Sequence, residues 1–193
     1  MPRSQARITC LFCLSLCLIL SAAYAADANP LDFGAAGEPG RANFFGKIPS
    51  GPQAFDGIPF EFRDTMVRVQ PGKQQRIDFP PTLAAGIHFL HFTEQAGSMI
   101  GAYTLVYADG TRVEVPLQGG INIQDWWLAG PLPFAAQAYT DAFPASPEKE
   151  QKIGFWRFSV RNPHPDTPLA AIEVKNSDAM VTINLIAVSL TET

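Results

Sequence analysis

The residues best suited to ligand chemistry lie together in one short stretch, Asp125-Trp126-Trp127. Indole rings offer flat apolar faces, and a carboxylate beside them can accept hydrogen bonds from two neighbouring donors. Adjacent residues of an extended chain point to opposite faces, so we expect one of the two tryptophans to face outward. The competing interpretation is structural: Trp126 joins the core, Trp127 covers the end of a sheet, and Asp125 accepts backbone N–H groups of its own loop.

Two arginines form the next candidate group. In the segment from Ile153 to Arg161, side-chain alternation places Trp156 on one face and both Arg157 and Arg161 on the other. We expect Trp156 to be a core residue. The planar guanidinium groups suit bidentate contacts with hydroxyls or carboxylates, and pairing with cross-strand acids is the alternative.

Tyr139 and the histidines complete the set of candidates. Tyr139 lies in a proline-rich loop between Ala129 and Pro147, where its ring adds a second aromatic platform or packs against its own loop. His88 and His91 are three residues apart, which on a strand places them on opposite faces. They therefore cannot chelate one ion together, and we expect each to be a hydrogen-bonded core histidine.

Catalytic motifs are absent from the sequence. There is no Gly-x-Ser-x-Gly elbow, no His-Glu-x-x-His pair and no phosphate-binding loop. Asp125 with Glu94 or Asp141 could form a glycosidase-like carboxylate pair, but any acidic chain offers such pairs by chance. We therefore expect no enzymatic activity and no cofactor. The sequence leaves open whether the chain binds a structural calcium ion, which would be held mostly by backbone carbonyls.

The N-terminus predicts export. Two arginines precede an apolar run from Ile8 to Leu20, and Ala23-Tyr24-Ala25 fits the small-x-small pattern of a signal-peptidase site. We predict a signal peptide at residues 1–25 and a secreted or periplasmic mature chain that starts at Ala26. The apolar run is shorter than the roughly 20 residues that cross a bilayer, so an uncleaved anchor is the weaker alternative.

Composition indicates an acidic globular domain. The 193 residues are 47% hydrophobic and 17% charged, with a formal net charge of −4. This length suits one domain, and the acidic charge disfavours nucleic acid as a partner. All three cysteines lie within residues 1–25, so we expect no disulfide in the mature chain. No later apolar segment is long enough to cross a membrane, so no membrane span is expected after processing.

The rest of the chain reads as short strands. Residues 26–54 predict an irregular lead-in segment with one short strand at Asn43 to Ile48. From Phe55 onward, strand-like runs alternate with turn signals. The seventeen prolines spread along the whole chain disfavour long helices. The expected strands are Phe55 to Phe62, Gln75 to Phe79, Gly86 to Thr93, Ala102 to Ala108, Arg112 to Leu117, Ile121 to Asp125, Ile153 to Arg161, Ala170 to Val174 and Val181 to Leu190.

Turn residues and strand patterns favour one fold class. Asp109-Gly110 predicts a tight hairpin turn, and Pro116 in the second arm indicates that this end of the strand lies at a sheet edge or leaves the sheet. The runs from Ile87 to Phe92 and from Ile183 to Val188 are apolar on both sides, which is typical of strands buried on both faces. We predict an all-β fold for residues 55–191, a two-sheet antiparallel β-sandwich of the jelly-roll type, with an up-and-down barrel as the alternative.

Five motifs occur in an order that resembles a known family. They are Phe55-Asp56-Gly57-Ile58-Pro59-Phe60, His88-Phe89-Leu90-His91, Tyr103-Thr104-Leu105-Val106-Tyr107-Ala108-Asp109-Gly110, Asn122-Ile123-Gln124-Asp125-Trp126-Trp127 and Arg161-Asn162-Pro163-His164-Pro165-Asp166. From about Phe55 to Leu190 the chain resembles galactose-binding-like jelly-roll domains of bacterial secreted proteins. These are of the carbohydrate-binding-module type that is often attached to glycoside hydrolases. The resemblance implies a carbohydrate or glycan as partner.

The combined prediction is a non-catalytic secreted carbohydrate-binding module. Sugars are bound by aromatic faces together with planar polar groups, so the candidate carbohydrate-binding residues are Asp125, Trp126, Trp127, Tyr139 and Arg157. The alternative is a structural or protein-interaction domain of the bacterial cell envelope, in which the same aromatics meet a partner protein. A small glycan-active enzyme is a weaker third interpretation.

Overall fold

The computed structural model describes residues 28–32, 36–40, 44–142 and 152–192. The predicted signal peptide, its cleavage site and all three cysteines lie outside these ranges. Apart from short helical turns at Ala36 and at Phe44–Phe45, the described residues form strands, turns and loops. Among them, no helix has the length and apolar character needed to span a membrane. The all-β prediction is confirmed.

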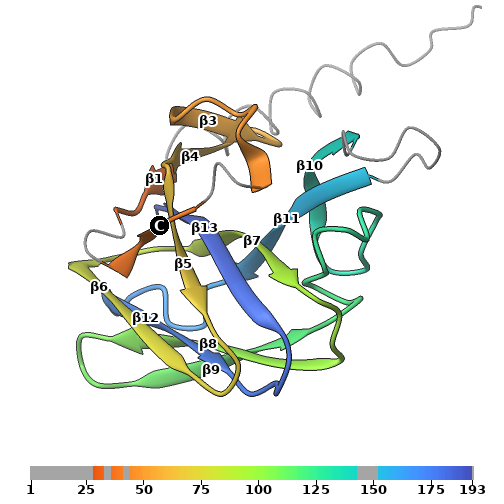
Figure 1. Ribbon diagram of the computed structural model, residues 1–193. Helices are drawn as coiled ribbons and strands as arrows, with labels where there is room; N and C mark the ends of the chain where they lie inside the picture. Colours follow the sequence, from red (N-terminus) through yellow and green to blue (C-terminus); the bar gives the residue numbers. More distant parts are fainter. Residues whose placement is uncertain (1–27, 33–35, 41–43, 143–151, 193) are drawn as a thin grey trace, which may run out of the picture.

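Two sheets and a separate hairpin make up the described chain (Figure 1). The strands are β1 (Ala28–Pro30), β2 (Glu38–Pro39), β3 (Gly51–Phe55), β4 (Ile58–Phe62), β5 (Thr65–Val69), β6 (Gln74–Thr82), β7 (Gly86–Glu94), β8 (Met99–Tyr107), β9 (Arg112–Gln118), β10 (Ala136–Ala142), β11 (Lys152–Arg161), β12 (Leu169–Asn176) and β13 (Thr182–Thr191).

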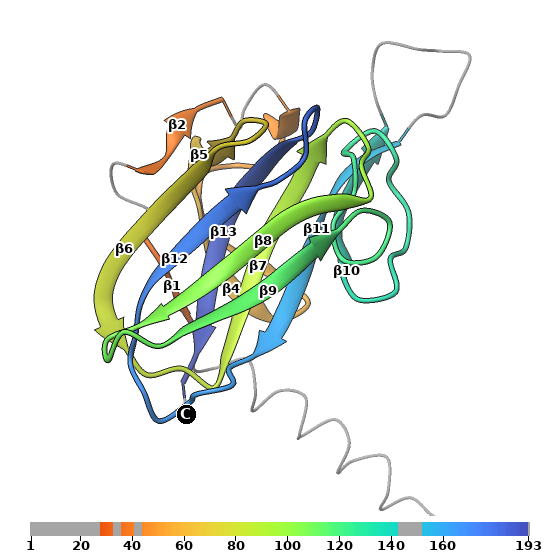
Figure 2. The same ribbon diagram turned by 90° about the horizontal axis from the view of Figure 1, so that it is seen from below.

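The strand order confirms the antiparallel sandwich. The larger sheet runs β10-β11-β7-β13-β5-β2, with β1 beside β13, and the smaller sheet runs β6-β12-β8-β9. Figure 2 shows β12, β8 and β9 lying in front of β13 and β7. Between β5 and β13 the chain crosses repeatedly from one sheet to the other, as a jelly roll requires. The two sheets are not joined into one closed sheet, so the barrel alternative does not hold.

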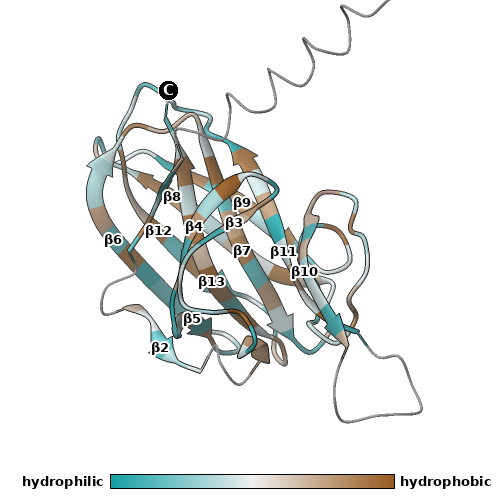
Figure 3. Cartoon of the chain, turned by 90° about the horizontal axis from the view of Figure 1, so that it is seen from above, coloured by the Kyte–Doolittle hydropathy of each residue, from teal (hydrophilic) through white to brown (hydrophobic). Residues whose placement is uncertain are grey.

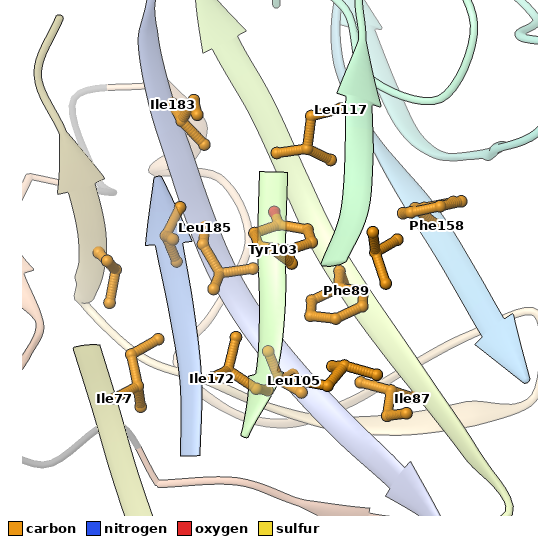
Figure 4. Packing of buried hydrophobic residues seen from close by; sticks show 14 of the residues in the cluster. Ile77, Ile87, Phe89, Tyr103, Leu105, Leu117, Phe158, Ile172, Ile183 and Leu185 are labelled. Atoms are coloured by element: carbon orange, nitrogen blue, oxygen red, sulfur yellow. The ribbon is translucent and has the colours of Figure 1, made fainter. Parts of the chain in front are cut away.

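The core between the sheets is built mainly of aliphatic side chains with a few rings. Phe89 of β7 stacks on Tyr103 of β8 with ring centroids 4.2 Å apart, and Ile172 and Leu185 pack around them (Figure 4). Such burial stabilises the fold by about 1.5–3 kcal/mol for each large apolar side chain.

Strands β7 and β13 occupy the middle of the larger sheet and are buried along both faces, as their apolar patterns predicted. Their inner face meets the smaller sheet. Their outer face is covered by the hairpin β3–β4, which lies across β7 and β13 (Figure 3).

A second apolar cluster fills the space under that hairpin, and we call it the outer aromatic cluster. Its buried aromatic members on the outer face are Phe45, Phe60, Phe62, Phe92 and Phe155, and Trp156 joins the cluster from the other face of β11. Phe45 meets Phe92 and Phe155 edge-on, with ring centroids 5.2 Å and 5.0 Å apart. Residues 44–54, which we expected to be irregular lead-in, therefore contribute to a core. The strand expected at Asn43 to Ile48 is wrong in its described part, because Phe44–Phe45 form a helical turn.

Two Asp-Gly pairs make two different hairpin turns. Gly110 has a positive φ of 89°, Gly110 N–H donates to Tyr107 O (3.0 Å), and the predicted hairpin β8–β9 is confirmed. Asp56 and Gly57 both have positive φ, 50° and 77°, which is the two-residue turn of a tight hairpin. The run from Phe55 to Phe62, predicted as one strand, is therefore interrupted by that turn.

Other strand predictions need correction at particular places. Ile121 to Asp125 forms turns and isolated bridges instead of a strand. Strands β5 and β10 were not predicted. The residues of β10 are small or polar and no more than half-buried, because it is the edge strand beside β11, so it lacks a strong apolar pattern. Pro116 does lie in an edge strand, β9, as expected.

Candidate functional site

The candidate residues come from one loop and two neighbouring strands. Asp125, Trp126 and Trp127 lie between β9 and β10, in residues 119–135, which we call the 119–135 loop. Tyr139 lies in strand β10, where we had expected a loop, and Arg157 lies in β11. The structure packs Trp126, Trp127 and Tyr139 against the outer aromatic cluster and places Arg157 on the outer face of the larger sheet.

Several hydrogen bonds fix the 119–135 loop to the sandwich. Thr93 N–H donates to Gln124 O (2.9 Å), and Trp126 N–H donates to Thr93 O (3.0 Å). The indole N–H of Trp156 donates to Gly130 O (2.9 Å) from a fully buried position, which confirms Trp156 as a core residue. A loop held in this way presents its exposed side chains in one arrangement.

A turn carries both tryptophans of the Asp-Trp-Trp motif. Leu128 N–H donates to Asp125 O (2.8 Å), so the backbone is not extended here. Both indoles are half-buried against the outer aromatic cluster, and their ring centroids lie 4.5 Å apart. The alternation expected of an extended strand therefore does not apply. Trp126 also meets Phe44 edge-on at 5.0 Å.

Asp125 acts on its own turn, as the structural interpretation allowed. The backbone N–H of Trp127 donates to Asp125 Oδ1 (3.2 Å). Partial burial raises the pKa of this carboxyl above its ordinary value, and the bond from Trp127 opposes that change. The nearby Glu94 accepts hydrogen bonds from Arg68 Nη2 (2.6 Å) and Asn184 Nδ2 (3.2 Å). Asp125 therefore stabilises its own turn, whereas Glu94 pairs with Arg68.

Tyr139 is part of the cluster wall. Its ring stacks on Phe155 with a centroid distance of 5.4 Å and an angle of 15°. Its hydroxyl donates to Asp141 Oδ2 (3.2 Å), and that carboxylate also pairs with Lys47 (2.5 Å). These contacts leave Tyr139 half-buried.

The exposed apolar side chains of the loop were missed by the sequence analysis. Phe134 is 70% exposed and Leu128 is 51% exposed. Phe134 N–H donates to Ile121 O (3.0 Å), which fixes the backbone beneath the ring. The available signal was the pair Pro131 and Pro133. Their fixed φ angles limit the ways in which the backbone can turn Phe134 toward the core.

Arg157 and Arg161 do share one face, opposite Trp156, as predicted. The register pairs Arg157 with Leu90 of the outer aromatic cluster and Trp156 with His91 of the inner face. Arg157 Nη2 donates to Asp56 Oδ2 in the β3–β4 turn (3.1 Å). Arg157 therefore forms an ion pair, as the alternative interpretation expected. Its partner comes from the hairpin above the sheet and not from a neighbouring strand. Arg157 Nε is buried without a hydrogen-bond partner.

A hollow lies on this outer face, at the end of β7 away from the 119–135 loop. Its volume is about 500 Å³, and we call it the His88 hollow. The register places Ser159 and Ser189 on either side of His88, and Arg161 and Thr191 on either side of Gly86. The lining residues are Ala85, Gly86, His88, Ser159, Val160, Arg161, Pro165, Asp166 and Thr191.

The two histidines occupy different faces of β7, as predicted. His88 Nδ1 lies 2.9 Å from Ser159 Oγ, and His88 Nε2 is buried without a partner. Burial, helped by the charge of Arg157, lowers the pKa of His88 to about 4. His91 is fully buried on the inner face, where Nε2 donates to Asn122 O (2.9 Å) and Nδ1 accepts from Tyr103 (2.8 Å). Burial lowers the pKa of His91 to about 3.

The outer face of the smaller sheet is polar and carries its own network. Glu173 accepts hydrogen bonds from Gln74 (2.7 Å), Arg76 (2.9 Å) and Arg112, and the bond from Arg112 is the main cause of its lowered pKa. Because these charged and polar groups are bonded to one another, we interpret this face as a solvent-exposed sheet surface. Within the described residues, no three His, Cys, Asp or Glu side chains are grouped to hold a metal ion.

Comparison with known proteins gives only distant likenesses. No protein-family model and no curated protein sequence matches the chain. Similar solved structures include AlgX from Pseudomonas aeruginosa (11% identity, TM-score 0.35) and the Agl-KA catalytic domain (15%, 0.41). Another is the CBM35 from Cellvibrio japonicus Abf62 (12%, 0.31). They cover 66%, 86% and 86% of this chain. The chain spans 26% of the first two and 94% of the third.

Proposed function

We propose that this chain is a non-catalytic carbohydrate-binding module that recognises a saccharide through the 119–135 loop. The observation that carries the proposal is the aromatic ring of Phe134, 70% exposed on a loop that is bonded to the sandwich at its base. Removing such a ring from water on binding is favourable, and a flat ring can lie against the C–H face of a pyranose.

The neighbouring side chains add the remaining parts of a sugar site. Leu128 extends the apolar surface, and the half-buried Trp127 offers an indole edge. Asp125 lies at the base of the same turn, where a carboxylate can accept hydrogen bonds from hydroxyl groups. Because the backbone is already bonded in place, binding would cost little ordering of the loop.

Export belongs to the same proposal. The basic start, the apolar run and Ala23-Tyr24-Ala25 support cleavage after Ala25 and a secreted or periplasmic mature chain. The ordered motifs that resemble galactose-binding-like modules support a glycan as ligand, alone or beside a glycoside hydrolase. Neither a cofactor nor catalysis is needed for this role.

A glycan array with the mature chain from Ala26 tests the proposal, followed by titration of the hits with Phe134→Ala. Losing a central stacked ring should weaken binding by more than about tenfold, since truncating a central contact costs about 2 kcal/mol or more. Met180→Ala is the matched control, because Met180 is equally exposed at 71% but lies between β12 and β13. Saccharide binding should also change tryptophan fluorescence through Trp127.

Stability measurements make the result interpretable. Phe134→Ala should change the free energy of unfolding by less than about 0.5 kcal/mol, because the ring is mostly exposed. A loss of binding with unchanged unfolding then belongs to the site. If no glycan binds, or if Phe134→Ala binds as the unmodified chain does, the proposal is wrong.

The exposed pair Leu128 and Phe134 also favours a second candidate, a protein-interaction domain of the cell envelope. Apolar side chains on a fixed loop suit the centre of a protein interface equally well. Binding to an envelope protein that Phe134→Ala abolishes and that no saccharide competes would favour this candidate over the first.

A further inference from the structure

We propose that the His88 hollow is a second binding site, which takes a small zwitterion carrying both a carboxylate and an ammonium group. This site is independent of the saccharide proposal, because it lies at the other end of β7 from the 119–135 loop.

Two opposite charges face the hollow without neutralising each other. Arg161 and Asp166 both line it, and neither makes an ion pair or a side-chain hydrogen bond with another described residue. Elsewhere on the described surface, Arg76 pairs with Asp78 (2.8 Å) and Arg63 pairs with Asp32 (3.1 Å). An unpaired guanidinium suits a carboxylate bidentately, and an unpaired carboxylate suits an ammonium group.

The lining of the hollow also includes a buried polar atom without a partner. The side chain of His88 is only 9% exposed, and its Nε2 makes no hydrogen bond while Nδ1 is engaged by Ser159. Buried polar atoms are nearly always bonded, so an unpaired one marks a position for a bonding partner. Ser159 and Thr191 place hydroxyl groups beside it.

Gly86 keeps this wall open. A Cβ at position 86 would lie 3.6 Å from His88 Nε2 and 2.8 Å from Thr191 Oγ1. Nε2 is itself buried, and the lack of a side chain at position 86 leaves space beside it that a Cβ would occupy at van der Waals contact.

The balance of charges selects the ligand class. Arg161 and Asp166 carry one charge of each sign, and His88 is neutral near pH 7 because burial lowers its pKa to about 4. A simple anion would be repelled by Asp166, and a simple cation would be repelled by Arg161. A neutral polyol would leave both charges uncompensated. A zwitterion satisfies both, and His88 Nε2 can bond either end of it without adding charge.

Calorimetric titration of the mature chain with glycine, β-alanine and 4-aminobutanoate tests the site and its spacing. Lactate and ethanolamine each supply one of the two charges, and glucose supplies neither. We expect one of the three amino acids to bind at least about tenfold more tightly than lactate, ethanolamine or glucose, as charge-assisted contacts of about 1.5 kcal/mol or more imply.

Two charge variants separate the ends of the ligand. Arg161→Gln should weaken the amino acid and lactate alike. Asp166→Asn should weaken the amino acid but strengthen lactate, because it removes the charge that repels an anion. Arg63→Gln and Asp78→Asn make the same charge changes away from the hollow and should alter nothing. Gly86→Ala should abolish binding with both charges intact, once its melting temperature shows that it folds.

Three outcomes would overturn the proposal. The first is that none of the three amino acids binds. The second is that glucose binds as tightly as they do and Asp166→Asn leaves the amino acids unaffected, which would identify a polyol site. The third is that Arg161→Gln and Arg63→Gln weaken binding equally, which would indicate a general charge effect.

Discussion

The two faces of the larger sheet are buried in different ways. The inner face packs against the smaller sheet through a mainly aliphatic core that β5 to β13 build among themselves. The outer face packs against Phe45 and hairpin β3–β4 through the outer aromatic cluster. One core follows from strand pairing, whereas the other depends on an N-terminal segment whose described part pairs with the larger sheet through the short strands β1 and β2.

The same difference separates the two candidate sites. The 119–135 loop and Tyr139 rest on the outer aromatic cluster, so their placement depends on the N-terminal segment. The His88 hollow rests on β7, β11 and β13 and on the loop after β11. The comparison teaches that residues 44–62 are part of the folded unit, and it predicts which changes will disturb one site without the other.

The largest effect is expected from removing the cover. A chain that starts at Arg63 loses Phe45, Phe60 and Phe62, each worth about 1.5–3 kcal/mol of burial, against a total stability of about 5–15 kcal/mol. Thermal melting and binding of a hydrophobic dye should show an unfolded or partly folded chain, with the mature chain from Ala26 as control. A truncated chain that melts within a few degrees of the control would show that the outer cluster is dispensable.

A smaller effect should distinguish the tryptophans. Trp156→Ala should lower the free energy of unfolding by about 3–5 kcal/mol, because the ring is fully buried. Trp127→Ala should cost about half as much or less, since its indole is half-buried in the same cluster. Urea unfolding of both variants measures the difference. Equal losses would mean that Trp127 is as deeply structural as Trp156 and would weaken its assignment to a ligand site.

Within β11, Trp156→Phe removes the indole N–H and keeps a smaller aromatic ring. The variant leaves Gly130 O without its donor, which should cost about 1–3 kcal/mol in addition to the packing lost with the second ring. If the unfolding free energy is unchanged, the bond to Gly130 does not anchor the 119–135 loop.

Much of the sandwich could be predicted because its strands carry local signals. The doubly apolar runs of β7 and β13 indicated central strands, and Pro116 indicated an edge. An Asp-Gly pair predicted the turn at Asp109, and a second pair is present at Asp56. Because the second pair lies inside an apolar run, the run was predicted as one continuous strand. The strands that were missed, such as β10, lie at an edge and have no continuous apolar face.

The candidate sites were less predictable, because they depend on contacts between distant segments. The alternation rule failed at Trp126 and Trp127, since a turn closed by Leu128 replaced the extended chain. The exposure of Phe134 depends on where the loop is bonded to the sandwich, and the nearby Pro131 and Pro133 are only a partial local signal of it. The shared face of Arg157 and Arg161 was predictable from alternation alone, but the hollow beside them required the register that sets His88 next to Ser159.

The smallest effect compares the two faces through the histidines of one strand. In the folded protein burial lowers the pKa of His91 to about 3, whereas in the unfolded chain it is about 6.5. Between these pH values the unfolded chain binds more protons, so this contribution to stability is complete above about pH 6.5 and is lost as the pH falls below it. The loss reaches at most about 1.4 kcal/mol for each pH unit.

The variant His91→Gln should remove that dependence. A glutamine can accept from Tyr103 and donate to Asn122 O as His91 does, but it does not titrate. Urea unfolding between pH 7 and pH 3 should show a shallower decline than in the unmodified chain. His88→Gln is the matched variant on the outer face. It should flatten the profile as much as His91→Gln between pH 7 and pH 5, where both histidines are neutral in the folded protein, but less below about pH 4, because burial lowers the pKa of His88 only to about 4. If the two variants flatten the profile equally down to pH 3, burial affects the two histidines of β7 alike.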